Sequence, residues 1–289
     1  MEKIAILADS GCQIPIGSME DKGVFIVPLN ITIGDKAYLD QIEISSIEVF
    51  KKIAKEGILA KTSQPSTGVI QEAVEKIKAQ GYTHIIALPI ATGLSSTLDG
   101  MRLACDMVEI PVTLIDTKST ANNHAYLVNV TKQLIDEGKT IEEITTIVTD
   151  LVEDSGTLIM APNLEHLKRG GRITPAVALL GSMLKIVPVM KLNYALGGKI
   201  DTLDKVRTIK KANIKIIEHM VNECHINNTD YVFAIEHVLV DDLANEMKQT
   251  LIDKIGECKD IVVRELPAVV GVHMGTGGVG YQFIKKYQG

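Results

Sequence analysis

Tryptophan is absent from this chain of 289 residues, and aromatic residues together make up only 4% of it. Because hydrophobic residues still account for 46%, the apolar volume has to come mainly from Leu, Ile, Val, Ala and Met. Such aliphatic side chains suit a smooth apolar pocket, but they build an ordinary hydrophobic core equally well. Composition alone favours the core.

Cysteine is scarce as well. The four cysteines, at positions 12, 105, 224 and 258, are far apart and form no CxxC pair. Disulfide scaffolds are usually smaller and denser in cysteine, so we expect reduced thiols and a cytoplasmic protein. The first apolar run, within residues 4–9, is too short for the core of a signal peptide. No run reaches the ~18 apolar residues of a membrane helix, so stable membrane insertion is not expected.

Positive charge is not in excess in this sequence. The net charge is −6, with 36 acidic and 30 basic residues and no long basic stretch. A nucleic acid partner is therefore not expected, because phosphate binding needs a concentrated positive face. The 7 histidines show no HExxH or other metal-ligand spacing, so neither a metal nor another cofactor is expected.

Familiar nucleotide and esterase motifs are missing too. The chain has neither a Walker A motif nor a GxSxG nucleophile elbow. Residues 275–280 match GxGxxG, but a dinucleotide site needs that motif between a first strand and a helix, and the chain ends at Gly289. We interpret residues 275–280 as a flexible turn whose backbone approaches a ligand or another loop.

The first half of the chain alternates short apolar runs with helical patterns. Strands are expected at residues 4–9, 84–89 and 112–116, and residues 23–34 form a second extended stretch. Helices are expected from Ser45 or Ser46 to Gly57, and then around residues 69–81, 101–108, 121–137 and 140–153. This order is typical of an open parallel α/β sheet, in which ligands bind beyond the carboxyl ends of the strands.

The second half changes character. Strands are expected at residues 157–162, 187–193, 231–238 and 261–266, with helices around residues 178–186, 207–224 and 241–255. This pattern indicates an α+β domain with a mixed or antiparallel sheet. We place the boundary near residue 155, giving an N-terminal α/β domain (1–155) and a C-terminal α+β domain (156–289).

Two hydroxyl-rich segments precede expected helices. Residues 62–66 read TSQPS and residues 92–97 read TGLSST. Ser and Thr are favoured as helix caps, so capping explains both segments as well as binding does. The same helix starts also suit an anion. At one sheet edge Thr62 and Ser95, with Ser63 and Ser96 beside them, are predicted to converge on a carboxylate without supplying a counter-charge.

His273 and a small basic cluster allow two interpretations each. His273 follows an apolar run, residues 269–273, that we interpret as a strand. A structural histidine is the plainer interpretation, but the glycine-rich turn after it permits close approach and favours a site. Residues 168–172, KRGGR, are either a solvated turn or a phosphate-contacting surface.

In their order and spacing, these blocks resemble the DegV family of bacterial fatty-acid-binding proteins over almost the whole chain. The blocks that carry the resemblance are Asp9-Ser10, residues 62–66 and 92–97, Asp116-Thr117, residues 164–173, 179–190, 198–200 and 206–208, and HMGTGGVG at 273–280. This chain departs from the family pattern at Gln13, which replaces an acid, and at Ser96, which replaces a glycine.

The resemblance implies two domains that enclose an acyl chain of about 14 to 18 carbons, such as palmitate, in a tunnel between them. It implies that Thr62, Ser95 and His273 bind the carboxylate. It also implies an arginine near the entrance, Arg207, and we add Arg169 and Arg172 as candidates for partner contact. Family members present the fatty acid to a separate fatty acid kinase, which makes acyl phosphate for phospholipid synthesis. This chain is therefore expected to be a carrier and not an enzyme.

The acyl tail needs an aliphatic wall, which an ordinary core would resemble in sequence. The candidates are Leu179, Leu180, Met183, Leu184, Ile186, Val187, Ile31 and Ile33. Two other functions remain open. One is a phosphotransferase-like enzyme, although neither a phosphate loop nor an acidic Mg²⁺ cluster is evident. The other is a regulatory lipid sensor.

Overall fold

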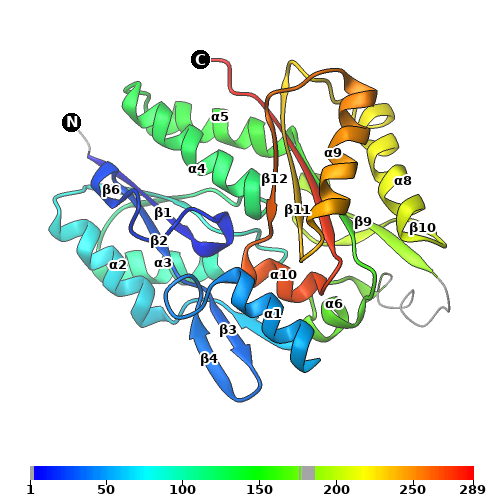
Figure 1. Cartoon of the computed structure of the whole chain (residues 1–289). Helices are drawn as coiled ribbons and strands as arrows, with labels where there is room; N and C mark the ends of the chain where they lie inside the picture. The colour runs from blue at the N-terminus through cyan, green and yellow to red at the C-terminus, as the bar shows by residue number, and fades with distance from the viewer. Residues whose placement is uncertain (1–2, 176, 178–185) are drawn as a thin grey trace.

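A computed structural model describes residues 3–175, 177 and 186–289 of the chain (Figure 1). The described strands form three sheets: a parallel sheet of four strands, a mixed sheet of six, and a small antiparallel sheet of three. The fold class is therefore mixed α/β, with a parallel sheet from the first half and a mixed sheet from the second, as the sequence predicts.

The parallel sheet has the order β2 (Val24–Val27), β1 (Ile4–Asp9), β6 (His84–Leu88), β7 (Val112–Leu114). Both faces of β1 are buried, because alternate side chains enter two different core clusters. On one face pack α2 (Thr67–Ala79) and α3 (Thr97–Val108). On the other pack α4 (Ala121–Asp136) and α5 (Ile141–Glu153). This confirms the predicted open parallel sheet.

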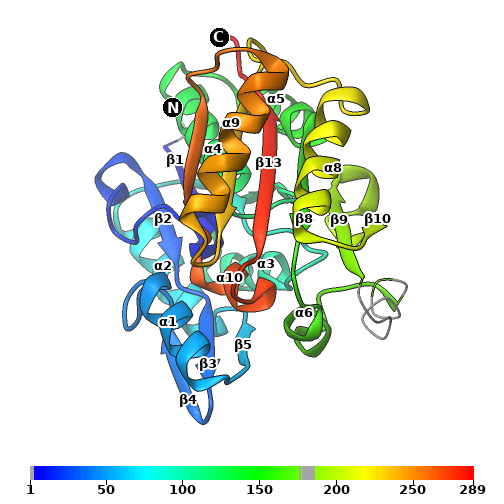
Figure 2. The ribbon, with the colours of Figure 1, turned by 45° about the vertical axis from the view of Figure 1, so that its right-hand side comes forward.

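The mixed sheet has the order β10 (Asp201–Val206), β9 (Val187–Asn193), β8 (Ser155–Met160), β13 (Val279–Lys285), β11 (Tyr231–His237), β12 (Ile261–Glu265). Only β11 and β12 run parallel among these neighbours. One face is covered by α8 (Ile209–Asn222) and α9 (Asp241–Ile255), and Figure 2 shows both helices in front of the sheet. β10 and the central strand β13 are not among the strands predicted from the sequence.

The small sheet has the order β4 (Lys36–Leu39), β3 (Asn30–Ile33), β5 (Ala60–Ser63). Next to it lie α1 (Ser46–Glu56), α6 (Glu165–Gly170) and α10 (Ala268–Met274) (Figure 1). Ser45 caps α1 in a capping box with Glu48, and Gly57 ends the helix, as predicted. One core cluster joins residues of both halves of the chain, from Leu29 to Met274. The short 3₁₀ turns are Ser10–Cys12, Glu20–Lys22 and Tyr194–Leu196.

Three segments need comment. Residues 23–34 are extended, as predicted, and they form two strands, because β2 pairs with β1 whereas β3 belongs to the small sheet. Residues 168–172 are not a solvated turn, since the end of α6 occupies residues 168–170 and Gly171 closes the helix with φ +68°. The apolar run before His273 is a helix, α10, and not a strand. The helix predicted around residues 178–186, with Leu179, Leu180, Met183 and Leu184, lies almost wholly outside the described residues.

Candidate functional site

A largely apolar cavity lies between the small sheet, the loop after β6 and the mixed sheet. The space between its walls, counting the open mouth, is roughly 800 Å³. Residues from both halves of the chain line it. The aliphatic part of its wall includes Leu29, Ile90, Leu94, Ile159, Leu192 and Leu266.

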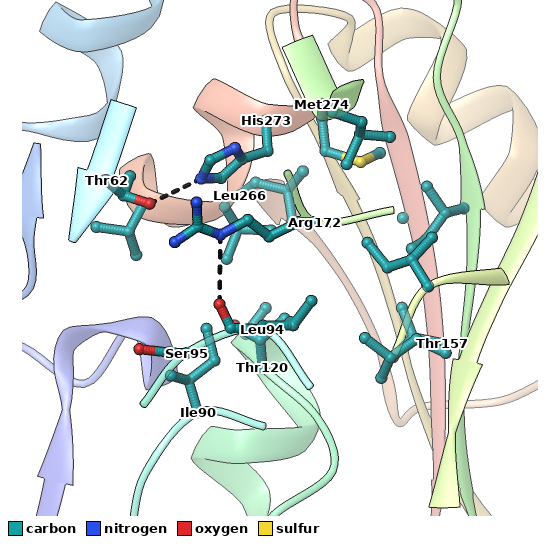
Figure 3. A pocket seen from close by; sticks show the side chains of 18 of the residues that line it. Thr62, Ile90, Leu94, Ser95, Thr120, Thr157, Arg172, Leu266, His273 and Met274 are labelled. Carbon is teal, nitrogen blue, oxygen red and sulfur yellow. Dashed lines mark hydrogen bonds between the residues drawn. The ribbon is translucent and has the colours of Figure 1, made fainter. Parts of the chain in front are cut away.

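Thr62 and His273 meet at one side of this cavity (Figure 3). Thr62 lies on β5, His273 lies on α10, and Thr62 Oγ1 is 2.7 Å from His273 Nε2. Burial lowers the pKa of His273 to about 3, with smaller effects from Arg172 and His166. The imidazole is therefore neutral at physiological pH, with one ring nitrogen as donor and one as acceptor.

Gly170 gives His273 the space that it occupies. A Cβ at Gly170 would lie 2.2 Å from His273 Nδ1, closer than any side chain permits. Among the described residues, the buried Nδ1 atom has no hydrogen-bond partner. The first glycine of the KRGGR segment is thus explained by the packing of His273 against the end of α6.

Arg172 lies in the cavity wall itself. Its Nε donates to the carbonyl oxygen of Leu94 at 3.3 Å, and its Nη1 donates to the carbonyl of Gly170. The guanidinium is half-buried, and desolvation lowers its pKa. The prediction that this end of the cavity has no counter-charge is therefore wrong, because the chain folds back after α6 and brings a cation beside Leu94.

Ser95 reaches the cavity from the loop after β6. Its Oγ shares a hydrogen bond of 2.8 Å with Oγ1 of Thr97, and the side chain is half-buried. We call Thr62, Ser95, Arg172 and His273 the head end of the cavity. These four side chains come from a strand, two loops and a helix (Figure 3).

The two predicted helix starts do not form this site in the way expected. Ser66, and not Thr62, caps α2, since the Ser66 hydroxyl accepts a hydrogen bond from the amide of Val69 at 3.3 Å. Thr62 belongs to the small sheet, where it pairs with Ile31. The two hydroxyls therefore reach one cavity from two different sheets, and not from one sheet edge.

Asp9 positions the loop that carries Ser95. Its carboxylate accepts hydrogen bonds from the amides of Gly11 at 2.9 Å and Ile90 at 2.8 Å, and burial raises its pKa to about 7.

Further along the loop, a Cβ at Gly93 would lie 2.3 Å from the carbonyl oxygen of Gly198. Two of the blocks that carry the family resemblance are thus in direct backbone contact.

The other predicted site residues lie in varied places. Ser63 lines the cavity and is exposed, whereas Ser96 is exposed and is not among the lining residues. Arg169 is exposed and pairs with Glu165, and Arg207 is exposed away from the lining. Two of the residues predicted for the wall around the tail, Ile31 and Ile33, are buried in the core cluster next to the cavity. Two others, Ile186 and Val187, are half-buried. None of these four is among the residues that line the cavity.

Among the lining residues that sequence reasoning missed are three polar ones, Thr157, Glu236 and Gln282; Gly280, which it placed in a flexible turn, lies in strand β13. Thr157, Glu236, Gly280 and Gln282 line the cavity from β8, β11 and β13, three neighbouring strands of the mixed sheet. We call them the floor; in Figure 3, Thr157 lies on the opposite side of the cavity from Thr62 and Ser95. A polar residue inside an apolar strand, such as Glu236 in YVFAIEH, is the signal that would have found them.

Neither a metal site nor a membrane span is found in the described part of the chain. Within residues 3–175, 177 and 186–289, no three His, Cys, Asp or Glu side chains are grouped so that they could hold a metal ion. Over the same ranges, none of the helices is both long enough and apolar enough to cross a membrane.

Comparison with known proteins agrees with this arrangement. The family model described as "Uncharacterised protein, DegV family" matches residues 3–286. A DegV domain-containing protein of Streptococcus pyogenes serotype M3 is 31% identical over 283 residues, covering 96% of this chain and 98% of the relative. Two crystal structures are similar over 99% of this chain and 100% of theirs. They are a fatty acid binding DegV family protein from Streptococcus agalactiae (28% identity, TM-score 0.89) and DegV, a fatty acid binding protein from Bacillus subtilis (25%, 0.86).

Proposed function

Because this chain belongs to the DegV family, we propose that it binds a long-chain fatty acid in the cavity, with the carboxylate held by Thr62, Ser95 and His273. One observation carries the proposal: the wall is largely aliphatic, while hydroxyls, an imidazole and a guanidinium gather at the head end. Its similarity to fatty acid binding proteins from Streptococcus agalactiae and Bacillus subtilis supports the same ligand class.

The head end has the chemistry that a buried carboxylate needs. Removing a carboxylate from water costs several kcal/mol unless it is hydrogen-bonded and paired. Thr62 and Ser95 provide hydroxyl donors, and neutral His273 provides one more donor in the suitable tautomer. Arg172 adds a charge-assisted donor, which strengthens a hydrogen bond about twofold. The proposed carboxylate site is thus cationic.

The acyl tail accounts for the affinity. Each buried methylene contributes about 0.8 kcal/mol, so a sixteen-carbon chain gains roughly 10 kcal/mol before the costs of ordering and association. The side chains that would contact the tail, Ile159, Leu192 and Leu266 among them, belong to the mixed sheet or to the segment directly after it.

The proposal extends to a carrier role. A separate fatty acid kinase would phosphorylate the bound carboxylate, and this chain would hold the acid without performing the chemistry. Arg169 and Arg207 are exposed and are our candidates for contact with that kinase. The support for this step is the family resemblance, together with a head end that is partly exposed at Thr62, Ser95 and Arg172.

Mass spectrometry of organic extracts tests the ligand. We expect the purified protein to carry one fatty acid of about 14 to 18 carbons per chain, the length that the family resemblance implies. Absence of lipid from the extract, together with no binding of added fatty acid, would contradict the proposal. Hydrolysis of ATP by the chain alone would instead indicate an enzyme.

Binding to the lipid-free protein tests the residues. Thr62→Val and Ser95→Ala should each weaken palmitate binding about fivefold to tenfold, the effect of one lost hydrogen bond. Matched controls are Thr32→Val, on the opposite face of the same small sheet, and Ser96→Ala, which is exposed. Equal affinities for all four variants would remove Thr62 and Ser95 from the carboxylate site.

A further inference from the structure

The floor of the cavity is unexpectedly polar for a site that holds an alkyl chain. Thr157, Gln282 and Glu236 are 5%, 2% and 0% exposed, and all three line the cavity. Strand pairing sets them on one face of the mixed sheet: Thr157 lies opposite Gln282, and Glu236 lies opposite Gly280. An apolar tail would leave these groups without hydrogen bonds to the ligand.

Gly280 makes this polar floor accessible. Its backbone does not require glycine, since its φ is not positive. A Cβ at Gly280 would find its nearest neighbours 3.8 Å away at the Glu236 carbonyl oxygen and 3.9 Å away at Leu266. A side chain is therefore sterically possible, and its absence leaves space between Ile159 and Glu236, which flank Gly280 in the sheet.

Gln282 already makes three hydrogen bonds within the protein. Its Nε2 donates to Thr120 O at 3.0 Å and to Thr157 Oγ1 at 2.9 Å, and its Oε1 accepts from the amide of Asn123 at 3.0 Å. Thr157 thus accepts one hydrogen bond, and within the part of the chain that the structure describes no acceptor takes the proton of its hydroxyl. The floor therefore offers one unused donor.

Glu236 offers unused acceptor positions. Its Oε1 accepts from Arg264 Nε at 3.0 Å, and its Oε2 accepts from the amide of Asn122 at 3.4 Å. A carboxylate has about four acceptor positions, so two of them remain open. Thr157 and Glu236 lie on β8 and β11, on either side of β13, so a donor and an acceptor stand at two neighbouring places on the same buried face. Each of them suits a neutral hydroxyl, which can donate and accept hydrogen bonds.

We propose that the floor is a second subsite, formed by Thr157 and Glu236 around Gly280, that recognises a hydroxyl carried on the acyl chain. The ligand class then includes long-chain hydroxy fatty acids. This inference rests on the proposed function, because it requires the carboxylate to occupy the head end. A second carboxylate does not suit the floor, since Glu236 already brings an acidic group there.

Competitive binding to the lipid-free full-length chain tests this subsite. The ligands are stearic acid, a series of its mid-chain hydroxylated isomers, and the dicarboxylic acid of the same length. At least one hydroxylated isomer should bind about tenfold more tightly than stearic acid, as expected for a well-formed buried hydrogen bond. The dicarboxylic acid should bind more weakly than that isomer.

Two variants of Thr157 locate the effect. Thr157→Val should remove the preference for the hydroxylated isomer while stearic acid still binds, and Thr157→Ser should keep it. Thr202→Val, on β10 of the same sheet and outside the lining, is the matched control. If Thr157→Val fails to fold, the affinities of the wild type and of Thr157→Ser for the same ligand series still show whether a hydroxylated isomer is preferred.

The outcomes separate the two proposals. If stearic acid binds as tightly as every hydroxylated isomer, or if Thr157→Val keeps the preference, the subsite is wrong and the fatty acid function stands. If none of these acids binds, both proposals fail.

Discussion

At the head end of the cavity, the polar side chains come from a short strand, two loops and a helix of seven residues, whereas at the floor they come from three adjacent strands in the middle of a sheet. The head end is partly open: Thr62, Ser95 and Arg172 are half-buried. The floor residues are almost fully buried. Parts of the head end can therefore adjust to a ligand, while the floor is held by the strand ladder.

The two ends also differ in charge. Arg172 contributes a cation at the head end, while at the floor Glu236 is already paired with Arg264. A carboxylate is attracted to a cation, most strongly away from water. This difference predicts that a fatty acid enters with its carboxylate at Arg172 and its tail towards the floor.

Closing the floor should have the largest effect on binding. Gly280→Leu places four carbons in space that the tail would occupy, displacing about four methylenes worth about 0.8 kcal/mol each. We expect roughly two-hundredfold weaker binding of stearic acid. Isothermal titration of the lipid-free variant measures this loss.

A shorter ligand provides the control for Gly280→Leu. Decanoic acid should not reach the floor, so its affinity should change little. Equal losses for both chain lengths would mean that the substitution perturbs the whole fold, or that the tail does not run to the floor. The thermal midpoint of the variant distinguishes these two explanations.

Removing the cation at the head end should have the next largest effect. Arg172→Gln keeps a polar side chain but loses a charge-assisted contact of about 2 kcal/mol, so palmitic acid should bind roughly thirtyfold more weakly. Hexadecanol, which has no charge, should lose much less. Arg169→Gln is the control, because Arg169 is exposed and pairs with Glu165. A similar loss in both variants would contradict the assignment of Arg172.

The two ends should also respond to acid in opposite directions. The pKa of His273 falls from 6.5 to about 3 on folding, so below pH 6.5 the unfolded chain takes up a proton that the folded chain does not. This lowers stability as the pH falls from 6.5 towards 3. Burial raises the pKa of Glu236 above 4.5 against the attraction of Arg264. Above pH 4.5 the unfolded chain therefore loses this proton before the folded chain does. The contribution of Glu236 to the free energy of unfolding falls as the pH rises.

Urea unfolding of the lipid-free protein at about pH 7 and about pH 5 measures both effects. When the pH is lowered from about 7 to about 5, the free energy of unfolding of His273→Asn should fall by about 2 kcal/mol less than that of the wild type. Glu236→Gln should lose more than the wild type. Identical changes in all three proteins would show that neither group has a shifted pKa.

Much of the fold follows from local sequence signals. Ser45 and Gly57 bound α1 as a capping box and a left-handed C-cap predict, and β9 occupies the predicted residues 187–193. Such signals act within a few residues, so they are visible in the sequence. The family blocks are a second local signal, and they single out Thr62, Ser95 and His273 by residue type and position along the chain.

Other elements depend on their surroundings. The run AVVGVHM, rich in β-branched residues, suggests a strand, yet it forms α10 because it is enclosed by α1, α6 and β5. A Cβ at Gly271 would lie 2.2 Å from the ring of Phe50, so glycine lets this helix pack directly on α1. A short apolar run does not by itself distinguish a buried strand from a buried helix.

The sequence by itself determined the ligand class to expect, the alternation of strands and helices, and the residue types of the head end. Tertiary structure decided which of these residues meet. Thr62 and His273 are 211 positions apart and come within hydrogen-bonding distance only when the small sheet and α10 pack together. The cation at Arg172 and the polar floor emerged in the same way, because contacts between distant segments depend on the packing of the whole chain and leave no periodic pattern in its sequence.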